Sequence, residues 1–284
     1  MSARLRVISI CLATGAFLLL AVQAQTQATE PHAGSEAQAG DNARGAFVEV
    51  LATNYFAQGP EAEAEFAPTP VMPGASGRAR VKVAAAGGAS VKAQFTGLKD
   101  PTTFGNEFLT YVLWGAIPNG RTLKISELAF KGDHWEAVAT TAMHTFAMVV
   151  TAEPYAAVTQ PSSIVVLKGT PATNNAAQAA SARFELLGDA YTPAGHSYEP
   201  LDRSSGYAPA FIQAMNARRI AQAFQAEKYA PQEFAAAEDH YQYMIHKLIQ
   251  EKKASKHLLS TADSVEEIFD KARSISIQRQ QNGK

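Results

Sequence analysis

The fold of this chain is decided by one stretch, Glu107-Phe-Leu-Thr-Tyr-Val-Leu-Trp-Gly-Ala-Ile-Pro-Asn-Gly-Arg-Thr-Leu-Lys-Ile-Ser-Glu-Leu128. It reads as two β-strands joined by a turn at 118–120, where Pro, Asn and Gly follow one another. The first strand, 108–117, is apolar on both faces, as is typical of an interior strand covered on both sides. The second, 122–126, alternates apolar and polar residues, so one of its faces is wet. This hairpin is predicted to lie in the middle of a β-sandwich.

Shorter segments of the same kind flank this hairpin and are separated by turn signals. Segments of strand type lie at 46–52, 78–83, 91–96, 135–140, 145–152 and 164–167. Seven or eight short strands with such spacing predict an all-β immunoglobulin-like sandwich over residues 45–170. The two Trp residues lack the flanking disulfide of antibody domains, so only the architecture is expected to be shared.

The hydrophobic period changes from 2 to about 3.6 near Tyr207. One amphipathic segment ends near Lys228, a second begins at Pro231 and a third begins near Ser260. Each has a single apolar stripe, which predicts a separate all-α helical hairpin or three-helix unit over residues 205–284. The intervening residues 171–204 are expected to be a linker, with an extra strand near 182–187 left open.

The N-terminus has the three parts of a secretory signal. Arg4 and Arg6 precede an apolar run at 7–22, and a small-residue site ends at Ala24. The run is shorter than the ~20 residues of a membrane-spanning helix, which favours a cleaved signal peptide over residues 1–24. Residues 25–44 have no apolar period and are expected to be a flexible tether. The predicted location is periplasmic or extracellular, with association with the outer membrane left open.

Composition excludes several classes of function. The net charge is −1 at pH 7, so the concentrated basic face of a nucleic-acid binder is not expected. Cys11 is the only cysteine and lies in the predicted signal peptide. The mature chain should therefore have no disulfide, no thiolate metal site and no cysteine nucleophile.

Few residues are candidates for chemistry. Asp133-His-Trp-Glu136, with His144 nearby, allows a metal or acid–base site, but a polar turn entering a strand is the favoured interpretation. His240 and His246 are six residues apart and so lie on different helix faces, whereas zinc helices space two His by four. No nucleophile elbow, P-loop or dinucleotide-binding motif occurs. We expect no enzyme activity, no metal and no cofactor.

Two surfaces are candidates for binding. Tyr111 and Trp114 suit a sugar platform, but they fall on opposite faces of one strand, so at least one belongs to the core. The basic pairs Arg218-Arg219 and Lys252-Lys253 suit an anionic lipid or polymer. The competing interpretation of these four charges is an ordinary solvated helix face.

Several segments resemble an uncharacterised family of bacterial envelope proteins. These segments are Asn216-Ala-Arg-Arg-Ile-Ala, Lys228-Tyr-Ala-Pro-Gln-Glu-Phe-Ala-Ala-Ala-Glu238, the helix 262–281, Tyr111-Val-Leu-Trp114, Val150-Thr-Ala-Glu-Pro154 and Pro161-Ser-Ser-x-Val-Val166. In that family an immunoglobulin-like sandwich accompanies an Ala-rich helical domain that often precedes an OmpA-like domain. The printed chain ends at Lys284 without an OmpA-like segment, so a peptidoglycan-anchoring role is not carried over.

These observations together predict a non-enzymatic, secreted cell-envelope protein with a structural or protein–protein interaction role. Its expected partner is an envelope protein, or a second copy bound through the helical domain. Neither nucleic acid nor a transmembrane span after signal cleavage is expected. The alternative is a carbohydrate-binding module, which would need an exposed row of aromatic side chains on one sheet.

Overall fold

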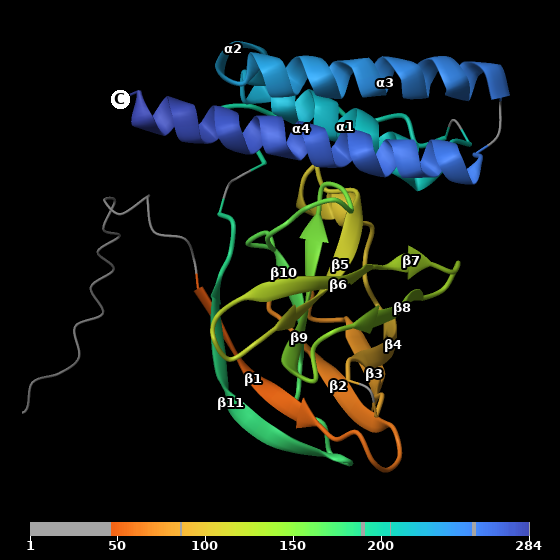
Figure 1. The fold of residues 1–284 in the computed structure, drawn as a ribbon, viewed down its shortest axis with the longest axis vertical. Coiled ribbons are helices and arrows are strands. Elements are labelled where there is room, and N and C mark those ends of the chain that lie inside the picture. Colours follow the sequence, from red (N-terminus) through yellow and green to blue (C-terminus); the bar gives the residue numbers. More distant parts are fainter. Residues whose placement is uncertain (1–46, 86, 189–190, 205, 252–253, 284) are drawn as a thin grey trace, which may run out of the picture. The chain divides into compact units, whose positions relative to one another are not determined.

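The computed structural model describes residues 47–284 except 86, 189–190, 205, 252–253 and 284. The signal peptide expected at 1–24 and the tether expected at 25–44 therefore lie outside the described residues. The described chain has a β-rich region followed by a C-terminal helical region (Figure 1). Both halves of the expected fold class are confirmed at that level.

The β-region is one large, curved antiparallel sheet. Its strands are β1 Phe47–Tyr55, β2 Ala62–Pro68, β3 Ser76–Val83, β4 Ala89–Thr96, β5 Thr110–Ala116, β6 Thr122–Glu127, β7 Ala129–Phe130, β8 Trp135–Thr141, β9 Thr145–Glu153, β10 Val165–Gly169 and β11 Ala176–Glu185, with a short 3-10 helix at Pro101–Phe104. Hydrogen-bonded neighbours follow the order β11-β1-β9-β10-β2-β3-β4-β8-β7. Off this path, β5 pairs with β9 and with β6, so the sheet branches at β9.

The hairpin predicted at the centre is formed by β5 and β6. All seven residues of β5 are buried, as an interior strand requires. β9 pairs along the whole of β5, and β6 pairs along its other edge. The turn between β5 and β6 contains Gly120 at φ 85°, in the left-handed region that glycine adopts without strain. The predicted hairpin and the interior position of β5 are therefore confirmed, whereas in the described chain β6 pairs with β5 alone.

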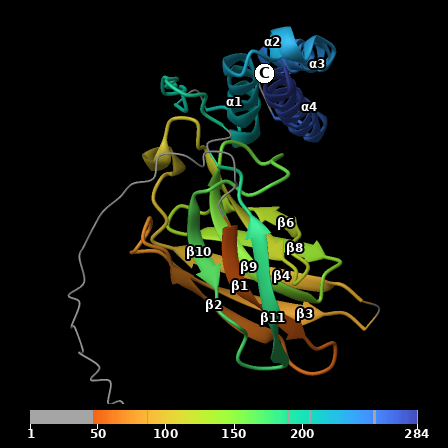
Figure 2. The same ribbon diagram turned by 90° about the vertical axis from the view of Figure 1, so that its left-hand side faces the viewer.

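One strand was not expected over its full length. Residues 171–204 were predicted to be a linker with an extra strand near 182–187, but β11 already begins at Ala176 and pairs antiparallel with β1 (Figure 2). Among the residues of this strand whose burial the structure describes, Ala182 and Phe184 carry the inward alternation that sequence patterns detect. The remainder is small and polar, and its strand conformation is set by backbone pairing with β1.

The described part of the C-terminal region contains four helices: α1 Pro209–Ala223, α2 Ala226–Tyr229, α3 Pro231–Glu251 and α4 Lys256–Asn282. Pro231 begins α3, where its missing N–H costs no hydrogen bond. Ser255 caps α4, because its side chain accepts a hydrogen bond from the backbone N–H of Leu258. The three long helices match the three predicted amphipathic segments.

The helices pack around α4, which contacts both α1 and α3. Phe269 of α4 lies between two aromatic rings of α3, with ring centroids 5.4 Å from Phe234 and 6.2 Å from Tyr241. Their buried side chains belong to the same continuous cluster as the core of the sheet. Within the described part of the chain, the helices all fall short of the length and apolar character that crossing a membrane requires.

Candidate functional site

The loop between β9 and β10 is hydrogen bonded to the helical region at three successive residues. The Tyr155 hydroxyl donates to Asp270 Oδ1 of α4 at 2.7 Å. The next two backbone N–H groups, of Ala156 and Ala157, also donate to helix side chains. Their acceptors are Gln213 Oε1 at 2.6 Å and Glu266 Oε2 at 3.1 Å. This loop is therefore the main point at which sheet and helices meet.

The amide side chains of α1 extend the same contact. Gln213 donates through Nε2 to Glu127 Oε1 at 2.6 Å, so its amide bridges β6 and the loop. Asn216, fully buried, donates to the carbonyls of Glu107 at 2.7 Å and Pro154 at 2.8 Å. Because buried polar groups are costly unless paired, these bonds fix the orientation of α1 on the sheet.

An ion pair closed to water lies behind this contact. Arg273 Nη2 donates to Asp270 Oδ1 at 2.7 Å, and the exposed fractions of the two side chains are 4% and 7%. The Arg273 guanidinium also lies 4.7 Å from the ring centre of Tyr191. Burial, assisted by the charge of Asp270, raises the pKa of Tyr155 well above its ordinary value. Its phenol therefore stays a hydrogen-bond donor at any physiological pH.

Glu153, at the end of β9, is fully buried. Its Oε1 accepts from the Ser162 N–H at 2.8 Å and from the hydroxyl of Thr151, which in turn accepts from Trp114 Nε1 at 2.8 Å. Among the described residues, its Oε2 has no partner. Burial raises the pKa of Glu153 to about 8, and the hydrogen bonds from Ser162 and Thr151 oppose this only in part.

Glu266 of α4 is the second closed-off carboxyl. Only 1% of its surface is exposed, and its Oε1 finds no hydrogen-bond donor in the described part of the chain. Burial, followed by the charge of Glu127, raises the pKa of Glu266 well above its ordinary value. Neither Glu153 nor Glu266 can touch a molecule in solution, so neither is placed to act on a substrate.

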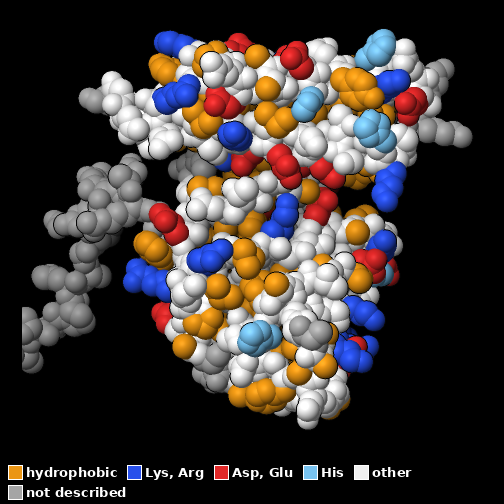
Figure 3. Space-filling model, viewed as in Figure 1, with side chains coloured by type: hydrophobic (Ala, Val, Ile, Leu, Met, Phe, Trp, Pro, Cys, Tyr) orange, Lys and Arg blue, Asp and Glu red, His pale blue; other side chains and the backbone are white. Residues whose placement is uncertain are grey.

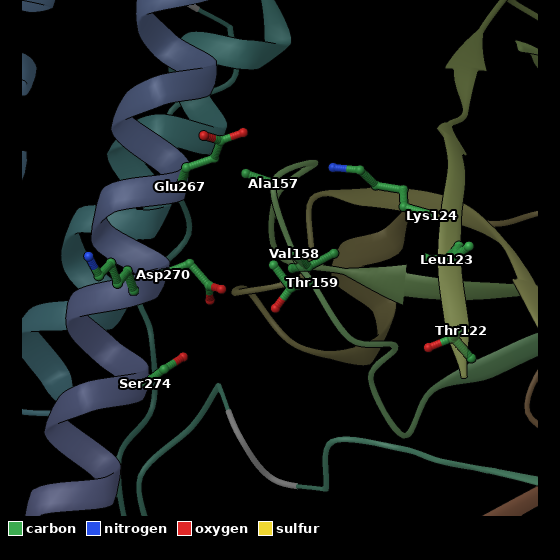
Figure 4. Close-up of a pocket in the computed structure, with 10 residues that line it drawn as sticks. Thr122, Leu123, Lys124, Ala157, Val158, Thr159, Glu267, Asp270 and Ser274 are labelled. Atoms are coloured by element: carbon green, nitrogen blue, oxygen red, sulfur yellow. The ribbon is translucent and has the colours of Figure 1, made fainter. Parts of the chain in front are cut away.

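A cleft of about 560 Å³ opens beside this contact, between β6 and α4 (Figure 4). It is lined by Thr122–Lys124 of β6, by Ala157–Thr159 of the loop and by Glu267, Asp270, Lys271 and Ser274 of α4. The spacing of the α4 residues by three and four places them on one helix face. The buried hydrogen bonds of the loop therefore hold the two walls of this cleft in place.

The cleft carries charges of both signs. Lys124 Nζ donates to the Ala156 carbonyl at 2.6 Å, and in Figure 4 it points across the cleft toward Glu267. Figure 3 shows carboxylate side chains gathered along this part of α4. Glu267 and Lys271 are exposed, and in the described chain neither side chain forms an ion pair or a hydrogen bond. Both charges are thus available to a ligand.

The structure describes only one of the two predicted basic pairs, Arg218-Arg219. Arg218 is 2.7 Å from Glu238 and lies over the ring of Tyr241, which ties α1 to α3. Arg219 donates to Asn216 Oδ1 and to two backbone carbonyls outside the helices. Both guanidinium groups are therefore engaged within the chain. Lys252 and Lys253 lie outside the described residues.

The turn that begins at Asp133 is polar, with Asp133 exposed and His134 and Glu136 partly buried. His134 Nδ1 is 2.5 Å from Asp133 Oδ1, and Glu136 forms an ion pair with Lys131 at 3.1 Å. Within the described residues, no group of three or more His, Cys, Asp or Glu side chains could hold a metal ion. The geometry is that of a polar turn.

The two residues of the predicted sugar platform both lie in the core. Tyr111 and Trp114 are fully buried. Trp135 packs edge-on against Tyr111 at 5.2 Å between ring centroids and lies 5.1 Å from Phe130. Phe130 is 58% exposed, and so it is the one ring of this group that is mostly open to solvent.

Sequence reasoning did not find the buried polar contact. A usable signal was present in α4, where Glu266, Asp270 and Arg273 recur at spacings of four and three beside the apolar stripe. Charges at these positions mark a helix face that meets polar groups of another element. Which element they meet could not be read from the sequence, because Tyr155 and Asp270 are 115 residues apart.

Comparisons with protein-family models, with characterised proteins and with solved structures find no match for this chain.

Proposed function

We propose that this protein is a non-enzymatic binding element of the bacterial cell envelope, and that it holds a segment of another polypeptide in the cleft between β6 and α4. One observation carries the proposal: a cleft with exposed charges of both signs whose walls are fixed by buried hydrogen bonds. A preformed site of this kind loses little conformational entropy when a partner binds.

The chemistry of the cleft favours a polypeptide partner over a highly charged polymer. Glu267 suits a Lys or Arg of the partner, while Lys271 suits an Asp or Glu one helical turn away. Leu123, 38% exposed, adds an apolar contact on the opposite wall. The carboxylate of Glu267 would repel a uniformly anionic lipid surface or polymer.

The two buried carboxyl groups with raised pKa values support a binding role rather than catalysis. Glu153 and Glu266 are closed to solvent, whereas a general acid or base must reach its substrate. Asp270 lines the cleft, but its side chain is only 7% exposed and already accepts hydrogen bonds from Tyr155 and Arg273. These groups therefore act as structural elements.

Export from the cytoplasm and an immunoglobulin-like fold of the β-region are part of the same proposal. The signal-like residues 1–24 support export to the periplasm or beyond. The resemblance to envelope proteins, together with short antiparallel strands around a buried Trp114, supports an immunoglobulin-like sandwich ancestry for the β-region.

A carbohydrate-binding module is the second candidate, supported by the exposed Phe130 ring against Trp135. One open aromatic ring gives a small platform for a sugar. If this candidate is correct, Phe130→Ala should abolish retention on an insoluble envelope glycan, and charge reversal in the cleft should have no effect.

Site-specific photocrosslinking tests the cleft directly. A photoreactive phenylalanine at Ser274, which is exposed and lines the cleft, should give one dominant protein adduct in envelope preparations. The same group at the exposed Asp133 serves as the matched control and should not give that adduct. The purified partner should then lose affinity at least tenfold for Glu267→Lys/Lys271→Glu. Equal crosslinking from both positions, or unchanged affinity, would contradict the proposal.

A further inference from the structure

Two carboxyl groups are sealed into the contact between the helical region and the sheet. Glu153 comes from β9 and Glu266 from α4, and each is at most 1% exposed. Each has one oxygen that accepts a backbone N–H, from Ser162 or Ala157, and one oxygen without a partner among the described residues. An ionised carboxylate in such a place would have half of its acceptor capacity unsatisfied, at a large cost in desolvation.

The groups that face Glu153 come from several elements. Thr151 lies on its own strand and Ser162 on the following loop. Asp270 of α4 contributes a second negative charge. The hydroxyl of Tyr191 is also buried and has no hydrogen-bond partner in the described chain. Burial, followed by the charge of Glu153, raises the pKa of Tyr191. The guanidinium of Arg273 is engaged by Asp270. No cation among the described residues is paired with Glu153 itself.

The groups that face Glu266 are also mostly acidic. Glu127 of β6 and Asp263 of α4 both disfavour its ionised form. Lys124 of β6 and the Ala157 N–H favour that form, with a smaller effect than burial. The local field therefore reinforces the effect of burial on the protonation of Glu266.

We propose that docking of α4 on the β-region is proton-linked, so that the contact is tight while Glu153 and Glu266 carry protons and loosens as they ionise. The two groups lie on either side of the same contact, one at the end of β9 and one on α4. A proton lost from either places an unpaired charge in a water-excluded interface. Because Ala157 both bonds to Glu266 and lines the cleft, loosening would change the cleft as well.

The direction with pH follows from the raised pKa values. An unfolded Glu titrates near 4.5, whereas folded Glu153 titrates at about 8. The stabilisation from the protonated group is complete below the unfolded pKa and is lost progressively as pH rises to the folded pKa. Glu266 acts in the same direction, since its pKa is also raised. Stability should therefore fall between about pH 4.5 and pH 8.

Urea unfolding of the whole exported chain across this pH range tests the inference. Between about pH 5 and pH 7.5 the unfolding equilibrium constant should rise by up to tenfold per pH unit for each group. Glu153→Gln and Glu266→Gln mimic the protonated acids, and each should remove its share of this slope. Glu267→Gln changes an exposed carboxylate next to Glu266 and should leave the slope as it is. Wild-type slopes in both single variants would overturn the inference.

A spectroscopic measurement on folded protein covers the case in which a variant does not fold. Trp114 is linked to Glu153 through the hydroxyl of Thr151, so its indole should sense the ionisation of that carboxyl. In a Trp135→Phe protein the emission of Trp114 should shift with a midpoint near pH 8. Emission that stays constant from pH 6 to pH 9.5 would overturn the inference. A shift that persists in Glu153→Gln would do so too.

Discussion

Tyr155 and Asp270, 115 residues apart in the chain, share a hydrogen bond of 2.7 Å that is closed to water. The first residue follows the interior strand β9, and the second lies on the C-terminal helix α4. This bond joins the β-region to the helical region at the point where the cleft begins. The first and third predictions below concern side-chain bonds between distant parts of the chain, and the second concerns the ion pair that Asp270 forms with Arg273 within α4.

Tyr155→Phe should lower the free energy of unfolding by about 1.5–3 kcal/mol, the usual range for a hydrogen bond to a charged group. The ring and its packing remain, while Asp270 loses one donor. Chemical denaturation at pH 7 measures the change. Tyr207→Phe removes an exposed hydroxyl and is the control, expected within 0.5 kcal/mol of wild type. Equal stability of the two variants would show that the buried bond contributes nothing.

Arg273→Met should cost about 3–5 kcal/mol, because it leaves the carboxylate of Asp270 buried without its cation. Adding Asp270→Asn should recover much of the lost stability, because the buried carboxylate that has no cation is then removed. The double-mutant cycle measures the coupling between the two side chains. If the two losses simply add, the pair does not act as an ion pair.

The Asp100–Arg203 pair should give a small, acid-sensitive contribution. Arg203 donates to both carboxylate oxygens at 2.8 Å and, as the main cause, lowers the pKa of Asp100 to about 2. Because both side chains are more than 40% exposed, Asp100→Asn should cost only about 1 kcal/mol or less at pH 7. A depressed pKa confers stability above the unfolded value that is lost as pH falls toward 2, so the two proteins should converge in acid. Constant separation down to pH 2 would contradict this.

The sequence-based prediction of a cleaved leader is tested by intact mass. Exported protein should begin near Gln25, because the apolar run at 7–22 is followed by a small-residue cleavage site. Retention of residues 1–24 in the exported form would show that the run acts as an anchor.

Much of the fold is local and could be predicted. The apolar residues on both faces of β5 predict an interior strand, and the single apolar stripe of each of α1, α3 and α4 predicts an amphipathic helix. The N-terminal part of β11 was missed, because its Ala- and Gln-rich residues form a strand only through pairing with β1. A partner strand more than 100 residues away leaves no periodic signal.

The candidate site could be predicted much less well. Arg218 and Arg219 drew attention as exposed charges, whereas in the fold they bridge α1 to Glu238 and to two backbone carbonyls. Glu153 sits in an apolar strand and reads in sequence as an ordinary solvent-facing residue. In the fold it is fully buried, close enough to Asp270 of α4 and to Tyr191 to interact with both electrostatically. These are tertiary effects that spacing along the chain does not report.

Equilibrium unfolding followed by two probes on one sample tests the central claim, that buried polar bonds join the sheet and the helices into one unit. Trp114 and Trp135 lie in the β-region, so fluorescence reports the sheet, while ellipticity at 222 nm is dominated by the helices. We predict coincident urea transitions at pH 6, with the same midpoint and the same cooperativity. Helical signal that is lost at lower urea while the Trp emission stays native would contradict the account.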